Sequence, residues 1–205
     1  MVVVSLPRRR CSTPDDARLL FSCRHTCCPL HLHPASPSHD IRYELYEEGF
    51  VIYTKFAKLA ETDDARIELQ VWAIGVLVDM LHDMERAKDF AERCNEKEVW
   101  SRLGKAQLDE DLVTLAINSY IKAEDPSHYS DVIAAAERED SYDAMVPYLV
   151  MARKQIKEAA LDTTLIYAYA KSSNLSELEE FISAPNVANI QSIGERCFDE
   201  VGSTI

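Results

Sequence analysis

The feature that most constrains this chain is a helical spacing of apolar residues that recurs from about residue 41 onward. These residues fall three and four positions apart, as in Ala87, Phe90, Ala91 and Cys94. Such spacing places them in one stripe along an α-helix. No comparable stretch alternates apolar and polar residues with a period of two. The sequence therefore predicts an all-α fold and needs no strands.

The predicted helices recur in pairs. A unit that begins at Met84 aligns with one that begins at Val113, at an offset of 29 residues. Further units begin near Tyr142 and Leu175, and an earlier one near Tyr46. Helix pairs at a period of about 30–40 residues are typical of an α-α solenoid, in which each pair buries its apolar face against the next. We expect the packing positions of the repeats to be Ala87, Phe90, Cys94, Trp100, Leu103, Ala116, Tyr120, Tyr129, Val132, Tyr148 and Phe181.

Short polar segments between the predicted helices carry residues that cap helices. Asn95 precedes a helix expected to begin at Glu96, and Glu98 completes a capping box with it. Asp125 precedes Pro126, an order that favours an acidic cap followed by Pro at the first helical position. Connections this short force neighbouring helices to pack antiparallel.

The first 39 residues differ in composition from the rest. They hold five of the eight prolines and show no helical or strand periodicity, so we expect a disordered tail unrelated to the repeats. Residues 40–205 are expected to form the solenoid, incomplete at its C-terminal end. The tail also gathers thiols and imidazoles, which are zinc ligands. Their spacing matches no standard zinc motif, so no metal site is predicted from Cys23, Cys27, Cys28, His31 and His33.

The charge of the chain excludes some classes of partner. Residues 1–39 carry five Arg against two Asp, a net charge of +3, whereas the rest carries 17 basic and 33 acidic residues, a net charge of −16. A body this acidic argues against nucleic acid as a partner. The longest apolar stretch, "VWAIGVLVDML", is too short to span a bilayer and contains Asp79, so no membrane insertion is expected.

No catalytic or cofactor-binding residues are predicted. His82 and His128 are isolated, without Ser or Cys at the spacing of a catalytic triad. Cys94 could suggest a nucleophile, but Ala123 stands at its equivalent position in the next unit. A methyl group can replace a thiol in packing but not in catalysis, so we expect Cys94 to pack and the chain not to be an enzyme.

Several long motifs then carry a family resemblance. The stretches "RAKDFAERCNEKEVWSRLGKAQL", "AINSYIKAEDPSHYSDVIAAA" and "LSELEEFISAPNVANIQSIGERCFDE" resemble the leg of the clathrin heavy-chain family over about residues 84–200, and "ELYEEGFVIYTKF" adds residues near the start of the repeats. The resemblance implies a right-handed, tetratricopeptide-like superhelix of short helix pairs. It also implies assembly with other clathrin heavy-chain legs and with clathrin light chain into cytoplasmic coats on vesicles and coated pits, in vesicle-mediated transport and endocytosis.

A second class of function stays open. Vacuolar sorting proteins carry similar helical repeats, so the alternative is an adaptor or scaffold that binds other proteins. The near-continuous match to the clathrin leg favours a structural coat component over a generic adaptor. One departure from the family pattern is Pro147, which we expect to kink its helix or to move the helix start.

Overall fold

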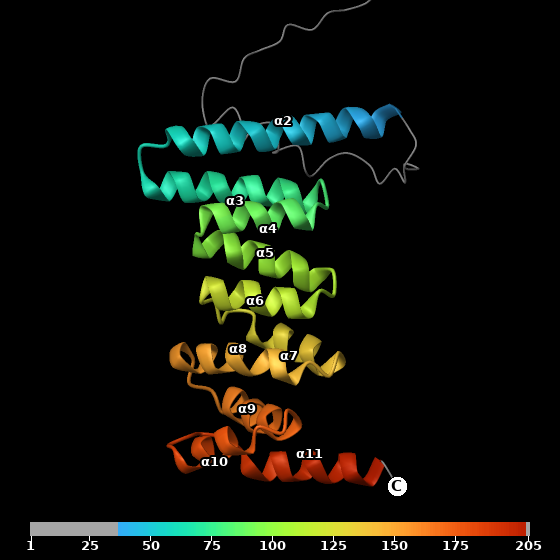
Figure 1. The fold of residues 1–205 in the computed structure, drawn as a ribbon, viewed down its shortest axis with the longest axis vertical. Coiled ribbons are helices and arrows are strands. Elements are labelled where there is room, and N and C mark those ends of the chain that lie inside the picture. The colour runs from blue at the N-terminus through green and yellow to red at the C-terminus, as the bar shows by residue number, and fades with distance from the viewer. Residues whose placement is uncertain (1–36, 204–205) are drawn as a thin grey trace, which may run out of the picture. The chain divides into compact units, whose positions relative to one another are not determined.

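The computed structural model describes residues 37–203, which contain ten helices and no strand (Figure 1). The predicted all-α fold is therefore confirmed for this part of the chain. The helices divide into two compact units, one ending at Asp83 and the other beginning at Met84. Of the predicted tail, residues 1–36 lie outside the described range, and the last three residues belong to the first helix.

The first unit contains a hairpin of two helices, α2 (Pro37–Leu59) and α3 (Asp63–Asp79). The α3 helix begins where it does because the side chain of Thr62 accepts a hydrogen bond from the Ala65 amide at 3.3 Å. Tyr53 of α2 stacks on Trp72 of α3 with ring centroids 6.3 Å apart. This aromatic pair joins the two helices of the hairpin.

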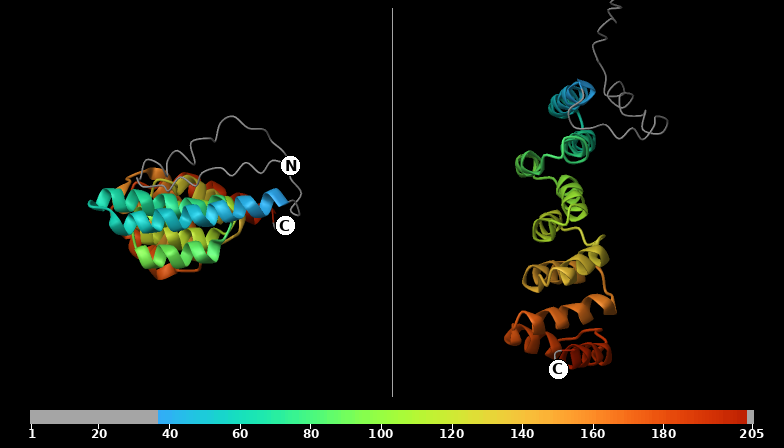
Figure 2. Two further views of the ribbon diagram at one scale, coloured as in Figure 1. Left: turned by 90° about the horizontal axis from the view of Figure 1, so that it is seen from above. Right: turned by 90° about the vertical axis from the view of Figure 1, so that its right-hand side faces the viewer.

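The second unit contains four helix pairs, and each begins at the residue expected from the repeat. The pairs are α4 (Met84–Cys94) with α5 (Lys97–Asp109), α6 (Val113–Ala123) with α7 (Tyr129–Arg138), α8 (Tyr142–Gln155) with α9 (Ala159–Lys171), and α10 (Leu175–Ser183) with α11 (Ile190–Ser203). Contacts between helices run from each pair to the next: α5 packs on α6, α6 and α7 pack on α8, and α9 packs on α10 and α11. The right-hand view of Figure 2 shows the same succession within the second unit. This arrangement is an α-α solenoid.

The core of the second unit alternates large and small side chains. Tyr120, Tyr148 and Tyr167 are among its largest fully buried residues, and alanines fill the positions between helices. Gly104 lets α5 approach α6 closely, because a Cβ atom there would lie 3.2 Å from the Tyr120 ring. Apolar burial of this kind is the main stabilising contribution in a solenoid, since one helix pair cannot bury its own face.

The prediction that Asn95 caps the helix after it is wrong. Helix α5 begins at Lys97 with Glu96 at its N-cap, and no side chain caps it. Asn95 instead has φ of 52°, in the left-handed region, and its amide bonds the Ala91 carbonyl at 2.8 Å. It therefore ends α4, a role that asparagine tolerates better than most residues.

The prediction that Asp125 caps the next helix, with Pro126 at its first position, is also wrong. Helix α7 begins at Tyr129, so Pro126 does not occupy its first position. The Asp125 carboxylate accepts a hydrogen bond from the Ser127 amide at 2.8 Å, which closes a turn before the helix. The acidic residue shapes the corner rather than the helix end.

Most of these helices end at a residue in the left-handed conformation, and in the described residues no glycine takes that role. At several corners the amide that follows the left-handed residue bonds a carbonyl five residues back, as from Leu112 to Gln107 at 2.8 Å and from Asn174 to Tyr169 at 3.0 Å. This bond is the mark of a Schellman motif. The left-handed residues are His82, Asn95, Asp111, Glu124, Asp140 and Ser173, with φ between 51° and 58°.

Pro147 is the sixth residue of α8, so the helix start has not moved to accommodate it. Its ring removes the hydrogen bond that the Asp143 carbonyl would otherwise accept. Both residues are exposed, so water can satisfy that carbonyl.

Candidate functional site

The contacts between repeats hold a solenoid together, so we located each predicted packing residue. Cys94 and Tyr129 are only half-buried. The remaining nine are buried, with at most 7% of the side chain exposed: Ala87, Phe90, Trp100, Leu103, Ala116, Tyr120, Val132, Tyr148 and Phe181. The half-burial of Cys94 follows from its place at the last position of α4.

The corner between α6 and α7 bonds to the pair before it and to the pair after it. From the preceding pair, Lys97 forms an ion pair with Glu124 and the Ser101 hydroxyl bonds the Asp125 carboxylate. From the following pair, the Tyr148 hydroxyl donates to the Asp125 carbonyl at 3.3 Å and the Gln155 amide donates to the Glu124 carbonyl at 2.8 Å. One corner thus joins three successive helix pairs.

Ionisation of the Asp125 carboxyl depends on this corner. Partial burial opposes the charged form, but hydrogen bonds from Ser101 and Ser127 and the nearby His128 outweigh it and hold the pKa of Asp125 below its usual value. The carboxylate therefore stays ionised, and able to accept these bonds, at neutral pH.

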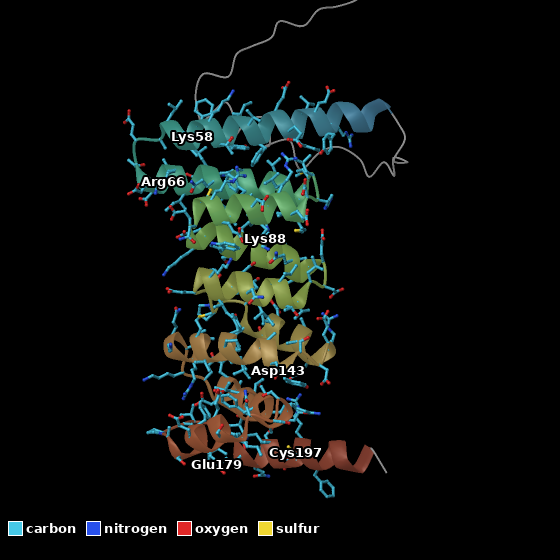
Figure 3. All side chains as sticks on the ribbon, viewed as in Figure 1. Lys58, Arg66, Lys88, Asp143, Glu179 and Cys197 are labelled. Atoms are coloured by element: carbon cyan, nitrogen blue, oxygen red, sulfur yellow. The ribbon has the colours of Figure 1, made fainter. Side chains whose placement is uncertain are left out.

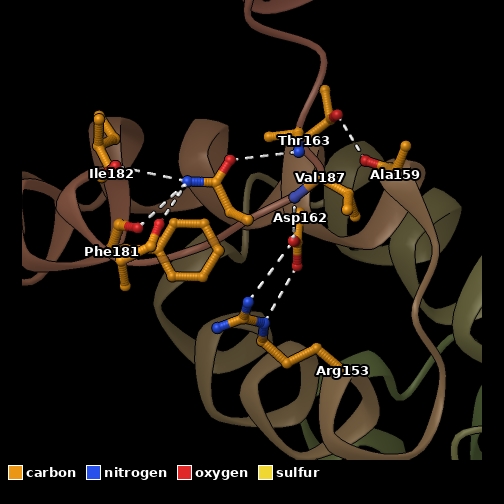
Figure 4. Close-up of polar contacts among 10 residues, drawn as sticks. Arg153, Ala159, Asp162, Thr163, Phe181, Ile182 and Val187 are labelled. Atoms are coloured by element: carbon orange, nitrogen blue, oxygen red, sulfur yellow. Dashed lines mark hydrogen bonds and ion pairs between the residues drawn. The ribbon is translucent and has the colours of Figure 1, made fainter.

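A second polar cluster fixes the α10–α11 loop against α9 (Figure 4). The buried Asp162 carboxylate accepts hydrogen bonds from Arg153 at 3.0 Å and from the Val187 amide at 3.0 Å. The Arg153 guanidinium also lies over the Phe181 ring, 4.4 Å from its centroid. The Asn186 side chain donates to the Ala184 carbonyl at 3.0 Å and so shapes the loop. This cluster was missed in the sequence, although an acid on the apolar face of α9 is a signal of a buried partner.

Several other charged side chains lie exposed at the surface. Lys88, Asp143 and Glu179 are exposed, whereas Cys197 is half-buried (Figure 3). Among the described residues, no group of three or more His, Cys, Asp or Glu side chains is placed to hold a metal ion. In the same range, no helix is both long enough and apolar enough to cross a bilayer. The tail cysteines and histidines considered for zinc lie outside the described residues.

Comparison with known proteins gives consistent matches. Residues 120–200 match the family model Clathrin, described as "Region in Clathrin and VPS". The clathrin heavy chain of Drosophila melanogaster is 51% identical over 160 residues, which is 78% of this chain and 9% of the relative. The clathrin heavy chain of Dictyostelium discoideum is 49% identical over 159 residues, which is again 78% of this chain and 9% of the relative. Human clathrin heavy chain 2 is 46% identical over 156 residues, which is 76% of this chain and 9% of the relative.

The chain belongs to the clathrin heavy-chain family. The residues matched by the family model, 120–200, include most of the second and fourth helix pairs of the second unit and all of the third. The chain spans about 9% of the length of the curated clathrin heavy chains it matches. The resemblance inferred from the sequence motifs is therefore confirmed.

The Tyr120 hydroxyl offers a test of the packing between these clathrin-type repeats. It is buried and has no hydrogen-bond partner among the described residues. Burial raises the pKa of Tyr120, and Asp125, Asp109 and Asp131 raise it further, so the hydroxyl stays protonated. Since an unpaired buried hydroxyl costs about 1–3 kcal/mol, we expect Tyr120→Phe to leave the free energy of unfolding unchanged or to raise it by about 1 kcal/mol.

Urea unfolding of the Tyr120→Phe variant measures this effect. Tyr148→Phe is the matched control, because its hydroxyl is bonded and its loss should lower the free energy of unfolding. A greater loss of unfolding free energy for Tyr120→Phe than for Tyr148→Phe would show that the Tyr120 hydroxyl has a strong hydrogen-bond partner in solution.

Proposed function

We propose that this chain acts as a structural segment of a clathrin-type leg and takes part in assembling vesicle coats in the cytoplasm. The observation that carries the proposal is the unbroken succession of four helix pairs. The last three share one buried core, and polar bonds join each pair to the next. Repeats of this kind give a solenoid its stiffness, because each pair is fixed by its neighbours. A stiff segment suits a protein whose role is mechanical rather than catalytic.

The proposal includes the partners and the geometry that the family implies. Other clathrin heavy-chain legs and clathrin light chain are the expected partners, and the solenoid is expected to wind to the right. The site of action is expected to be the cytoplasmic face of coated vesicles and coated pits, in vesicle-mediated transport and endocytosis. The acidic surface supports protein rather than nucleic acid as the partner.

A segment swap tests this function. The matching segment of Drosophila clathrin heavy chain, which is 51% identical, is replaced by the aligned residues of this chain. We expect the hybrid to assemble closed coats in vitro, seen by electron microscopy, with the yield of the parent. The same hybrid with Tyr148→Ala is the control and should assemble poorly, because the repeat core is broken.

Failure of a well-folded hybrid to form coats would contradict the structural role. The alternative, a helical-repeat adaptor, would then be favoured if the chain captured sorting proteins without joining coats.

A further inference from the structure

A hollow lies at the end of the α2–α3 hairpin where the two helices are joined, and all of its lining belongs to the first unit. Its volume is about 550 Å³. Tyr53, Phe56 and Trp72 line it, together with shorter apolar side chains. Trp72 is 41% exposed, and Leu59, also in the lining, is 75% exposed. An apolar hollow with exposed aromatic and aliphatic side chains is typical of a surface that another segment covers.

The charged side chains that line this hollow are all acidic. Glu61 and Glu68 line it, and no basic side chain does. The basic residues nearest to them in the sequence, Lys58 and Arg66, lie outside the lining, and Arg66 is paired with Asp63 at 2.6 Å. A segment that fits the hollow is therefore apolar, with basic residues beside its apolar part.

The chain itself contains such a segment before α2. Residues 2–10, "VVVSLPRRR", place four aliphatic side chains directly before three arginines and include no acidic residue. Residues 37–83 carry ten acidic and four basic residues, a net charge of −6, so the two segments attract each other. A second apolar stretch, residues 15–24, "DDARLLFSCR", has two Asp against two Arg and gains no such attraction. Charge therefore favours residues 2–10 as the occupant.

The segment can reach the hollow. Residues 11–36 connect it to α2, and 26 residues of extended chain span up to about 86–94 Å. The lining residues of α2 lie 16–22 positions after Pro37, which is about 24–33 Å along the helix. The connection is long enough to return along α2, and a link within one chain raises the local concentration of the segment at the hollow.

We propose that residues 2–10 dock in this hollow as an extended segment, with their aliphatic side chains on the aromatic lining and their arginines beside Glu61 and Glu68. Three consecutive valines favour an extended backbone, and Pro7 restricts the residue before it in the same sense. Apolar contact supplies most of the attraction, because ion pairs between exposed groups contribute little. The docked segment covers Trp72. The contact is independent of the assembly role proposed above.

Nuclear Overhauser effects in the full-length chain test the contact. Trp72 and Trp100 are its two tryptophans, and the Trp72→Phe variant assigns their indole signals. We expect cross-peaks between the Trp72 ring and valine methyl groups that disappear when the three valines at positions 2–4 are all replaced by serine. Cross-peaks from valines within α2 and α3 should remain in that variant.

A matched variant separates residues 2–10 from the rest of the segment before α2. Leu19→Ser with Leu20→Ser removes aliphatic side chains from residues 15–24 instead. We expect this variant to keep the cross-peaks between the Trp72 ring and the valine methyl groups, since its apolar stretch lacks net charge.

The contribution of charge is measured by the shift of the Trp72 indole signal, which lies between its docked and undocked positions. Glu61→Gln with Glu68→Gln should lower the docking equilibrium constant about two- to tenfold, as expected for two exposed ion pairs. Salt at about 1 M should act in the same direction. Glu44→Gln with Glu48→Gln removes the same charge from exposed positions of α2 outside the hollow and should change docking less.

Four results would overturn the proposal. Cross-peaks that are absent from the full-length chain, or that survive the triple serine variant, would mean that residues 2–4 do not contact Trp72. Equal effects of the two glutamine pairs would mean that Glu61 and Glu68 are not the site of attraction. Cross-peaks that fade on dilution would mean that a second copy of the chain supplies the occupant.

Discussion

Replacing Tyr148 by alanine is expected to lower the free energy of unfolding of the second unit by about 3–5 kcal/mol. Tyr148 is fully buried in the common core, and its ring lies 6.1 Å from that of Tyr120. Truncation leaves a cavity between α6 and α8, and it removes the bond from the Tyr148 hydroxyl to the Asp125 carbonyl. Both losses fall on the contact between two repeats. Urea unfolding followed by circular dichroism measures the change.

Two variants separate the causes of this loss. Tyr148→Phe keeps the ring and removes only the hydroxyl, so it should cost about 1 kcal/mol. Tyr43→Ala removes an exposed tyrosine from α2 and should change stability little. A loss of unfolding free energy below about 1 kcal/mol for Tyr148→Ala would mean that the neighbouring helices close the cavity, and it would contradict a large contribution of this ring to the core.

Replacing Asp162 by alanine is the second change for which we expect a large effect, a loss of about 2–4 kcal/mol. Only 7% of the Asp162 side chain is exposed, against 30% of Arg153. Its removal leaves the half-buried guanidinium without its carboxylate and the Val187 amide without its acceptor. The contribution is smaller than for a fully buried pair, because water reaches the arginine.

Asp162→Asn distinguishes charge from hydrogen bonding. The side-chain amide oxygen of the asparagine can still accept the hydrogen bond from the Val187 amide, so we expect an intermediate loss of unfolding free energy. Hydrogen exchange at the Val187 amide should accelerate strongly in Asp162→Ala and less in Asp162→Asn. Glu179→Ala, an exposed acid on α10, is the control and should leave exchange unchanged. Unaltered protection at Val187 in Asp162→Ala would contradict the loop contact.

The register of the repeats was predictable because it depends on apolar periodicity summed over many residues. The first residues of the four pairs, at Met84, Val113, Tyr142 and Leu175, are those that the sequence indicated. Packing of amphipathic stripes determines helix positions more strongly than any single residue does. The family resemblance followed from the same long stretches.

The corners were not predictable from the residues that occupy them. An asparagine between two helices can cap the second or end the first in the left-handed conformation, and both roles favour the same residue types. At Asn95 the path of the chain toward α5 selects the second role. The partner of Asp162 was hidden for a related reason, since Arg153 and Val187 approach it only after three helices have packed.

The corner formed by Glu124 and Asp125 has a mechanical consequence. A solenoid whose repeats touch only their neighbours bends at each joint separately, as a chain of independent hinges does. Here a single corner receives side chains from the helix pairs on both sides of it. A shift of this corner therefore alters the bonds to both neighbouring pairs at once.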